Sequence, residues 1–149
     1  MKPPPSTSKF WSVFNRFTAL NKVTYRLSGG RIGGKMPGSG APIILVHHRG
    51  RRSGEERVSP LIGVPEGDRW VIVASKGGTD RHPAWFHNLK ANPETEIEVG
   101  KEHIPVRARE VEGDERKLLW SVAAEAYPSY DDYQEFADRR IPVLSLDRR

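Results

Sequence analysis

The chain has 149 residues, which is the size of one domain with a single hydrophobic core. Hydrophobic residues make up 36% and charged residues 29% of it, and no stretch approaches the roughly 20 apolar residues of a spanning helix, so the composition excludes a membrane-spanning or disordered chain. The absence of cysteine excludes disulfides and thiolate metal sites, and the formal net charge of +5 predicts attraction to anions.

The N-terminal part predicts a tail, a helix and a loop. Residues 1–9 hold three consecutive prolines and lack the apolar run of a secretory signal, so we expect a flexible tail and a cytoplasmic location. From Phe10 to Leu27, apolar residues recur every three or four positions with Lys and Arg between them, which is typical of a basic amphipathic helix. Glycines in the following residues predict a loop, so we assign helix and loop to residues 10–40 and a second unit to residues 41–149.

This second unit has the pattern of strands in short hairpins. We predict strands over residues 43–48, 57–64, 70–75, 96–99, 104–111 and 141–146. About six antiparallel strands interrupted by helices, with no βαβ alternation, predict a mainly β (α+β) barrel.

Three helices are predicted between these strands. Pro83 begins the first, over residues 84–91, and an Asn-Pro pair ends it. The others are expected over residues 113–126 and 130–139. On the helix over 113–126, four apolar residues are expected to share one packed face: Leu118, Leu119, Val122 and Ala126.

The most charged local feature is the turn Arg-Gly-Arg-Arg-Ser-Gly at residues 49–54, which Arg57 follows. A glycine-flanked turn of this kind presents backbone N–H groups and guanidinium groups to phosphate or carboxylate oxygens. The alternative is a solvated hairpin loop that protects a sheet edge from aggregation. The residues by themselves leave both interpretations open.

Further candidate residues lie in three short motifs. A predicted strand ends in Ala-Ser-Lys-Gly-Gly at residues 74–78, where Lys76 offers a point charge and the glycines allow close approach of a ligand. Trp85 could flank a flat ring and Asn88 could bond its edge, although core packing is the more common role for such an aromatic residue. Tyr130 and Tyr133 are three apart and share a helix face, where phenols can donate hydrogen bonds over a pocket.

Other chemistries are disfavoured. His47 and His48 are adjacent in a strand and point to opposite sides, and the remaining histidines match no zinc spacing, so we expect no metal. The sequence has no Gly-x-Ser-x-Gly elbow, no cysteine nucleophile and no Gly-x-Gly-x-x-Gly dinucleotide fingerprint.

In this order, the motifs resemble the deazaflavin (coenzyme F-420)-dependent nitroreductase family, from about Gly33 to Leu146. The matching pieces are Gly-Arg-Arg-Ser-Gly at 50–54, Arg-Val-Ser-Pro-Leu at 57–61, Val-Ala-Ser-Lys-Gly-Gly at 73–78, His-Pro-Ala-Trp-Phe-His-Asn-Leu at 82–89, Ala-Asn-Pro at 91–93, Tyr-Pro-Ser-Tyr at 127–130 with Tyr133, and Arg-Ile-Pro-Val at 140–143. The resemblance implies a split β-barrel of the FMN-binding kind that binds coenzyme F-420.

The resemblance also implies roles for individual residues. The phosphate and acidic glutamyl tail of the cofactor would be held by Arg51, Arg52, Ser53 and Arg57. The deazaflavin would be lined by Val58, Ser59, Pro60, Ala74, Ser75 and Lys76, and completed by Trp85, Phe86 and Asn88. The candidate hydrogen-bond donors at the reaction centre are Ser75, Tyr130 and Tyr133. The sequence departs from the family at His47-His48-Arg49, where small hydroxyl residues are usual, and at Ile62 and Phe86, where Tyr is common.

The implied reaction is hydride transfer from the deazaflavin to a small-molecule acceptor such as a quinone, an activated ene or a nitroaromatic. One alternative is an FMN-binding barrel of the pyridoxamine-phosphate-oxidase kind. Another is a basic module that binds nucleic acid or membrane, although aromatic residues do not alternate with the basic turn as nucleic-acid stacking requires. We therefore expect no nucleic-acid partner. Contact of the N-terminal helix with the inner face of the cell membrane stays open.

Overall fold

The computed structural model describes residues 23, 25–30, 34–36, 38–76 and 81–149. Most of the predicted N-terminal helix therefore lies outside the described residues, and its last part, at 23 and 25–28, is helical. The glycines at 77 and 78 also lie outside them. Within the described residues, no helix is long and apolar enough to cross a bilayer.

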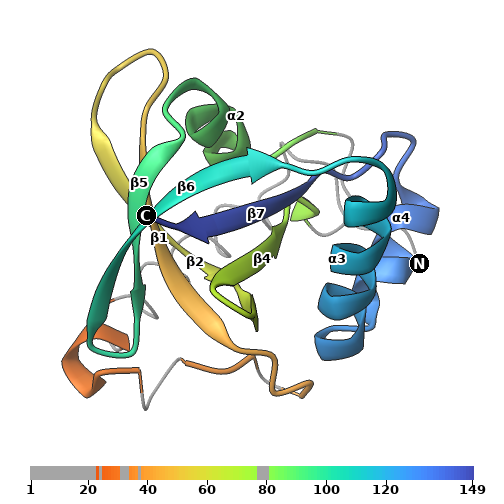
Figure 1. Ribbon diagram of the computed structural model, residues 1–149, viewed down its shortest axis with the longest axis horizontal. Coiled ribbons are helices and arrows are strands. Elements are labelled where there is room, and N and C mark those ends of the chain that lie inside the picture. Colours follow the sequence, from red (N-terminus) through yellow and green to blue (C-terminus); the bar gives the residue numbers. More distant parts are fainter. Residues whose placement is uncertain (1–22, 24, 31–33, 37, 77–80) are drawn as a thin grey trace, which may run out of the picture.

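One antiparallel sheet of seven strands forms the body of the protein, in the order β2-β1-β5-β6-β7-β4-β3. The sheet curls into a half-barrel, with β2 at one edge and β3 at the other (Figure 1). The strands are β1 (Ile43–Arg49), β2 (Glu56–Ile62), β3 (Val64–Glu66), β4 (Arg69–Val73), β5 (Glu94–Val99), β6 (Glu102–Glu110) and β7 (Val143–Arg148). The β1–β2 and β5–β6 pairs are hairpins that the sequence predicts, and a third hairpin joins β3 to β4.

The strand predicted over residues 57–64 is two strands, and this prediction was wrong. Gly63 interrupts it, because its backbone N–H donates to the carbonyl of Pro42 at 3.0 Å. A Cβ at Gly63 would overlap the side chain of Ile44, so the chain passes β1 more closely here than another residue would allow. The last strand begins at Val143, two residues later than predicted, and the strand predicted to Ser75 ends at Val73.

Besides the helical residues at 23 and 25–28, three helices of the described chain lie on the sheet: α2 (Ala84–Ala91), α3 (Gly113–Ala126) and α4 (Ser129–Phe136). The bounds of α2 and α3 agree with the prediction, and α4 ends three residues earlier than predicted. In Figure 1, α2 covers one end of the curled sheet and α3 and α4 lie together on another side.

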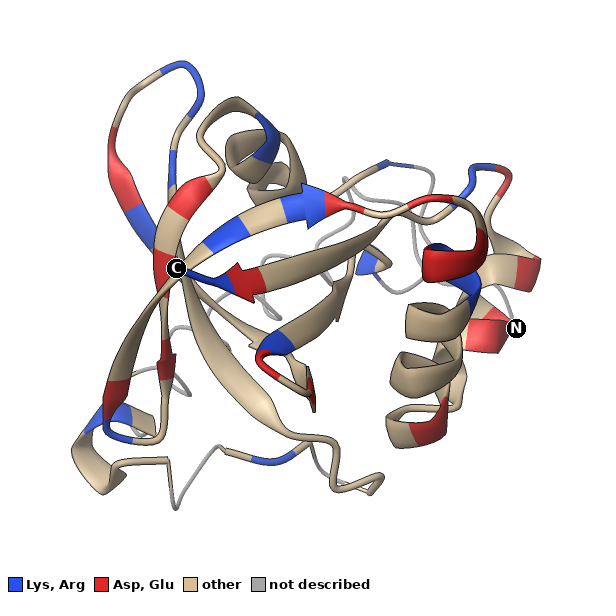
Figure 2. Cartoon of the chain, viewed as in Figure 1, with Lys and Arg blue, Asp and Glu red and all other residues tan. Residues whose placement is uncertain are grey.

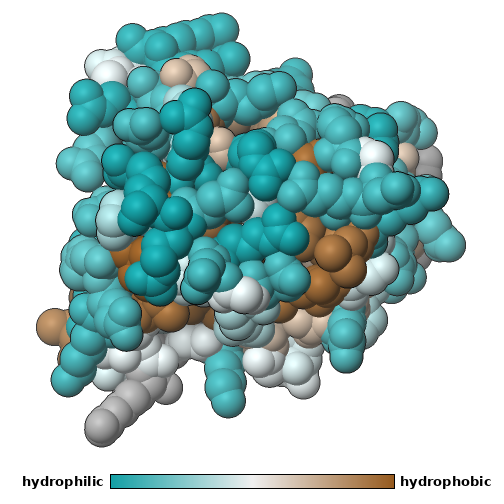
Figure 3. All heavy atoms as spheres, in the orientation of Figure 1, coloured by the Kyte–Doolittle hydropathy of each residue, from teal (hydrophilic) through white to brown (hydrophobic). Residues whose placement is uncertain are grey.

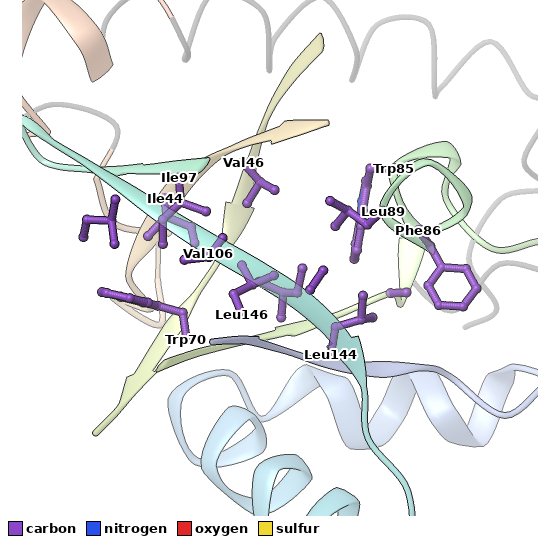
Figure 4. Packing of buried hydrophobic residues seen from close by; sticks show 14 residues of the cluster. Ile44, Val46, Trp70, Trp85, Phe86, Leu89, Ile97, Val106, Leu144 and Leu146 are labelled. Carbon is purple, nitrogen blue, oxygen red and sulfur yellow. The ribbon is translucent and has the colours of Figure 1, made fainter. Parts of the chain in front are cut away.

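The main core fills the inside of the curled sheet and the underside of α2. On β6, Ile104, Val106 and Ala108 are buried while the residues between them are exposed, which is the alternation of a strand with one covered face. Trp85, Phe86 and Leu89 bring α2 into the same cluster (Figure 4). Hydrophilic residues cover most of the face in Figure 3, with small hydrophobic areas between them.

A second core lies between α3, α4 and the outer side of β4 and β7. Its buried members include Val71, Leu119, Ala123 and Tyr130. Leu118, predicted on this packed face, is 52% exposed. Adjacent helix residues are about 100° apart, so Leu118 cannot face the sheet when Leu119 does. The remaining two residues of the predicted face, Val122 and Ala126, are partly buried against this core.

Candidate functional site

The basic turn joins β1 to β2 at the edge of the sheet. Two backbone hydrogen bonds close it, from Gly50 N–H to the Glu55 carbonyl and from Gly54 N–H to the Gly50 carbonyl, both at 2.8 Å. Gly54 has a φ of 73°, which explains a glycine here. The side chains of Arg51, Arg52 and Ser53 are exposed, and Figure 2 shows basic residues at the tip of this hairpin. The turn therefore presents positive charge to solvent on a fixed backbone.

The side chain of Asn88 on α2 is hydrogen-bonded to this turn. Its Oδ1 accepts a 3.0 Å hydrogen bond from the backbone N–H of Arg51, and its Nδ2 lies 2.9 Å from His48 Nδ1. Asn88 is on the buried side of α2 and is 6% exposed. The amide of Asn88 thus connects α2 to the basic turn through its oxygen and to β1 through its nitrogen.

The predicted ring-lining residues lie on two strands. Val58, Ser59 and Pro60 are half-buried on β2, next to Arg57, whose guanidinium lies 3.7 Å from Glu55. Ala74 and Ser75 are buried directly after β4. The strands β2 and β4 contact each other, which brings the two predicted segments into the same part of the molecule.

Lys76 has a left-handed backbone. Its φ is 45°, the one positive φ among the described non-glycine residues. Such a conformation costs about 1–3 kcal/mol in a non-glycine residue and is enriched at ligand-binding positions. The backbone before it is tied down, since Arg139 Nη2 donates to the Ser75 carbonyl at 2.7 Å and Nη1 lies 2.7 Å from His82 Nδ1. Burial, followed by the nearby charge of Arg139, lowers the pKa of His82, so its ring is neutral and accepts this bond.

Trp85 and Phe86 are core residues in this structure. They are 9% and 5% exposed and belong to the main cluster of the sheet interior. The ring centroid of Phe86 lies 4.9 Å from that of His82. Their predicted contact with a cofactor stays a prediction.

The predicted tyrosines form a cluster with a third, Tyr127. The hydroxyls of Tyr127 and Tyr133 are 2.9 Å apart, and the ring centroids of Tyr127 and Tyr130 are 4.9 Å apart. Burial raises the pKa of Tyr130. Burial, followed by the bond with Tyr127, also raises the pKa of Tyr133. Both phenols therefore stay protonated at neutral pH and can donate hydrogen bonds.

A possible metal-ligand cluster lies on the outer side of the sheet. His47, Glu98 and His103 offer ligand atoms within 4.8 Å of one another, although no sequence spacing indicated it. Glu98 is already bonded, at 2.7 Å to His47 Nε2 and through both carboxylate oxygens to Arg26. Burial alone would raise the pKa of Glu98, but the bonds from Arg26 and His47 lower it. We therefore interpret the cluster as an ion-pair network that holds the segment before Gly29 against β5.

Two surface hollows occur elsewhere. One, of about 550 Å³, is lined by Arg116, Trp120, Asp131, Gln134 and Glu135 on α3 and α4. The other, of about 250 Å³, lies beside His82 and Phe86 and is lined mainly by charged residues. Neither includes a residue of the basic turn, so the candidate site rests on the polar contacts described above.

The sequence assigned no role in the site to three residues of this arrangement: His48, Arg139 and Tyr127. His48 was expected to point away from His47, and this is confirmed, because His47 contacts Glu98 while His48 contacts Asn88 and Ser59. Its partners lie 40 and 11 positions along the chain, so no local motif identifies them. For Arg139, the one available signal was its position directly before the Arg-Ile-Pro-Val motif.

Comparison with known proteins places this geometry in a family. Residues 18–147 match the model of a family described as F420H(2)-dependent quinone reductase. The F420H(2)-dependent quinone reductase Rv1261c of Mycobacterium tuberculosis is 41% identical over 133 residues, which cover 87% of this chain and 89% of that protein.

Solved structures agree with the fold. An F420-H2 dependent reductase, FDR-A, has a TM-score of 0.67 and 45% identity, covering 71% of this chain and 94% of that one. A chain described as a domain-swapped dimer has a TM-score of 0.70 and 36% identity, covering 94% of this chain and 100% of that one. An FAD-binding protein from Mesorhizobium loti, 13% identical with a TM-score of 0.51 over 89% of this chain and 88% of that one, shares the fold alone. The predicted split-barrel fold is confirmed.

Proposed function

The chain belongs to the F420H(2)-dependent quinone reductase family, and we propose that it transfers a hydride from reduced coenzyme F-420 to a quinone-type small-molecule acceptor. It is accordingly an oxidoreductase, and coenzyme F-420 is the cofactor that its family uses. The observation that carries the proposal is the basic turn, which α2 holds in place beside the edge strand β2.

The basic turn fits the anionic part of this cofactor. Arg51 and Arg52 are exposed at the tip, and Arg57 follows on β2 with its side chain 54% exposed. Guanidinium groups bind phosphate and carboxylate oxygens through paired hydrogen bonds, and the cofactor carries both groups. Ser53 adds a hydroxyl beside them. We assign these four residues to the phosphate and the glutamyl tail.

The segment after β4 fits the ring. Lys76 provides a positive charge on a backbone that Arg139 fixes at the preceding carbonyl. A cation there would balance the acidic hydroxyl of the deazaflavin ring. Ser75 is 8% exposed and directly adjacent, so its hydroxyl is a candidate donor to the reacting centre. On β2, the ring would meet the Ser59 side chain and the backbone of Val58 and Pro60, whose side chains point to the other face of the strand.

The cofactor supplies the hydride, and the protein supplies position and hydrogen bonds. Holding donor and acceptor carbons about 3–3.5 Å apart removes much of the entropic barrier to reaction. As an acceptor such as a quinone gains negative charge, a hydrogen-bond donor beside its oxygen stabilises it. We assign this role to Tyr133, whose raised pKa keeps the phenol protonated. Tyr130 is 4% exposed within the second core, so its predicted role as a donor stays a prediction.

The test is a titration of the purified protein with oxidised coenzyme F-420 and with FMN, followed by tryptophan fluorescence at two salt concentrations, for the wild type and Lys76→Ala. We expect selective F-420 binding that the substitution weakens. Anaerobic turnover of reduced F-420 with a soluble quinone then tests the reaction. Preference for FMN, or no binding of F-420, would overturn the proposal.

We also propose that the N-terminal helix contacts a membrane surface, where quinones partition. The described end of this helix leaves Leu27 86% and Val23 52% exposed, while Tyr25 between them is buried against the barrel. Vesicle flotation of the wild type and of Leu27→Glu compares the two directly, because this substitution leaves Tyr25 in place. Equal flotation would contradict the contact.

A further inference from the structure

Three hydrogen bonds form a continuous chain from the basic turn to β2. The backbone N–H of Arg51 donates to Asn88 Oδ1 at 3.0 Å, Asn88 Nδ2 lies 2.9 Å from His48 Nδ1, and His48 Nε2 lies 2.8 Å from Ser59 Oγ. Asn88 and His48 are 6% and 5% exposed, so water cannot readily replace these partners.

The direction of all three hydrogen bonds follows from the first one, in which the Arg51 backbone N–H donates to Asn88. A backbone N–H only donates, so the oxygen of the Asn88 amide must face Arg51 and the NH₂ group must face His48. The NH₂ group also only donates, so His48 Nδ1 must be unprotonated and accept. The ring then carries its proton on Nε2, which donates to Ser59 Oγ.

The hydroxyl proton of Ser59 points away from His48, because the Ser59 oxygen accepts the bond from His48. No acceptor in the described part of the chain bonds this proton. Ser59 is two residues from Arg57 on β2, so both side chains lie on one face of an edge strand. A half-buried donor on the same strand face as an exposed arginine indicates an oxygen-bearing ligand.

We propose that Asn88 and His48 form a one-directional hydrogen-bond relay that fixes the Ser59 hydroxyl as a donor to an oxygen of the bound deazaflavin cofactor. The ligand part of this inference rests on the proposed function, whereas the direction of the relay rests on the contacts of this chain alone. Asn88 and His48 are positioning residues, and Ser59 touches the cofactor.

The relay also accounts for the buried histidine at position 48. A buried polar ring needs a partner at each nitrogen, and Asn88 and Ser59 provide them. If His48 served packing alone, its ring proton could be on either nitrogen, whereas the relay requires the proton on Nε2.

The first experiment measures this proton in the unliganded protein. Long-range ¹H–¹⁵N NMR correlations of the imidazole at neutral pH distinguish the Nε2–H ring from the Nδ1–H ring and from the imidazolium. We expect the neutral Nε2–H form for His48. The Nδ1–H form or an imidazolium would overturn the relay, whether or not the protein binds F-420.

The second experiment measures F-420 affinity in a double-mutant cycle of Ser59→Ala and His48→Met, with thermal melts to verify folding. One hydrogen bond is worth about 0.5–1.5 kcal/mol, so each substitution should weaken binding roughly 2- to 10-fold. In the Ser59→Ala background, His48→Met should add less than about 2-fold, because its effect passes through Ser59. His48→Gln, which can still donate to Ser59, should restore part of the affinity.

The controls are Ser121→Ala and His103→Met, which change an exposed serine on α3 and an exposed histidine on β6. Neither should alter the affinity. Multiplicative effects of Ser59→Ala and His48→Met would overturn the relay, and a wild-type affinity for Ser59→Ala would overturn the contact with the cofactor. If the wild type binds no F-420, the proposed function is wrong, and the NMR measurement still decides the relay.

Discussion

The guanidinium of Arg139 donates a 2.7 Å hydrogen bond to the backbone carbonyl of Ser75, 64 positions earlier in the chain. The same guanidinium reaches His82 at 2.7 Å, so it connects the end of β4 to the start of α2. Lys76, with its left-handed backbone, follows Ser75 directly. The segment after α4 thus holds the backbone from which the Lys76 side chain projects.

We expect Arg139→Ala to destabilise the protein and to weaken F-420 binding. Loss of hydrogen bonds from a charged donor costs about 1.5–3 kcal/mol. If Lys76 then loses its position, the affinity should fall roughly 10-fold, which corresponds to about 1.4 kcal/mol. Chemical denaturation and cofactor titration measure the two effects.

Arg140→Ala is the matched control for this prediction. Arg140 is the adjacent arginine, its side chain is 64% exposed, and its contact is a 3.4 Å ion pair with Glu112. Such surface pairs contribute about 0–1 kcal/mol. Equal affinities of the Arg139→Ala and Arg140→Ala variants would show that the bond to Ser75 has no part in cofactor binding.

The sequence predicted the elements whose signals are local. The helix over Ala84–Ala91 was predicted with its observed bounds because Pro83 and the Asn-Pro pair mark both ends. The hairpin at Gly100 was predicted from a glycine between two β-rich segments, and its φ of 60° explains that glycine. The break at Gly63 was not predicted, because it depends on the close approach of Ile44 from another strand.

The sequence indicated the charged residues of the candidate site, and it did not indicate the hydrogen bonds that hold them. Arg51 and Lys76 stand out in the sequence because glycines flank them. The bonds that hold them come from Asn88 and Arg139, which lie 37 residues from Arg51 and 64 residues from Ser75. No periodicity or spacing in the sequence indicates pairs so far apart, so these contacts could be identified only from the folded structure.

The basic turn predicts an affinity that depends on salt. Arg52→Gln and Arg57→Gln should each weaken F-420 binding about 5- to 50-fold at low ionic strength, because each removes a charge-assisted hydrogen bond. The difference from the wild type should shrink as salt increases, since both side chains are exposed.

Titrations at low and high salt measure this dependence. Lys117→Gln, an exposed basic residue on α3, provides the control for a general loss of positive charge. An equal effect of Lys117→Gln would indicate nonspecific attraction in place of a site at the turn.

Substitutions in the Tyr127–Tyr133 pair can distinguish a catalytic hydroxyl from a structural hydrogen bond. Tyr133→Phe and Tyr127→Phe both remove the 2.9 Å bond between the two hydroxyls, and only the first removes the Tyr133 phenol. We expect Tyr133→Phe to lower kcat for quinone reduction about 10- to 100-fold, in the manner of a lost transition-state donor, with unchanged F-420 affinity. Burial and Tyr127 raise the pKa of Tyr133, so wild-type activity should show no loss from ionisation of this phenol below pH 10.

Steady-state kinetics and cofactor titration of both variants test this role. Tyr127→Phe should retain most of kcat. If the two variants lose kcat equally, the hydroxyl pair is structural and the acceptor takes its hydrogen bond from another group.

Glu115 connects the start of α3 to two strands and makes stability depend on pH. Arg109 binds its carboxylate at 2.7 and 3.0 Å, and Arg69 binds it at 2.9 Å. The bonds from Arg109, followed by that from Arg69, lower the pKa of Glu115 from 4.5 to about 2. A carboxyl group with a lowered pKa in the folded state stabilises the fold above its unfolded pKa, and this contribution is lost as pH falls toward the folded value.

Glu115→Gln should therefore lower the melting temperature at pH 7. The difference in melting temperature between the variant and the wild type should shrink as pH falls from 4.5 toward 2. Thermal melts across this range measure it. Glu125→Gln, an exposed glutamate near the other end of α3, should change the melting temperature little at any pH. A gap between the wild type and Glu115→Gln that stays constant down to pH 2 would mean that the glutamate stabilises α3 through packing or helix-end charge, and not through its ionised bonds to Arg109 and Arg69.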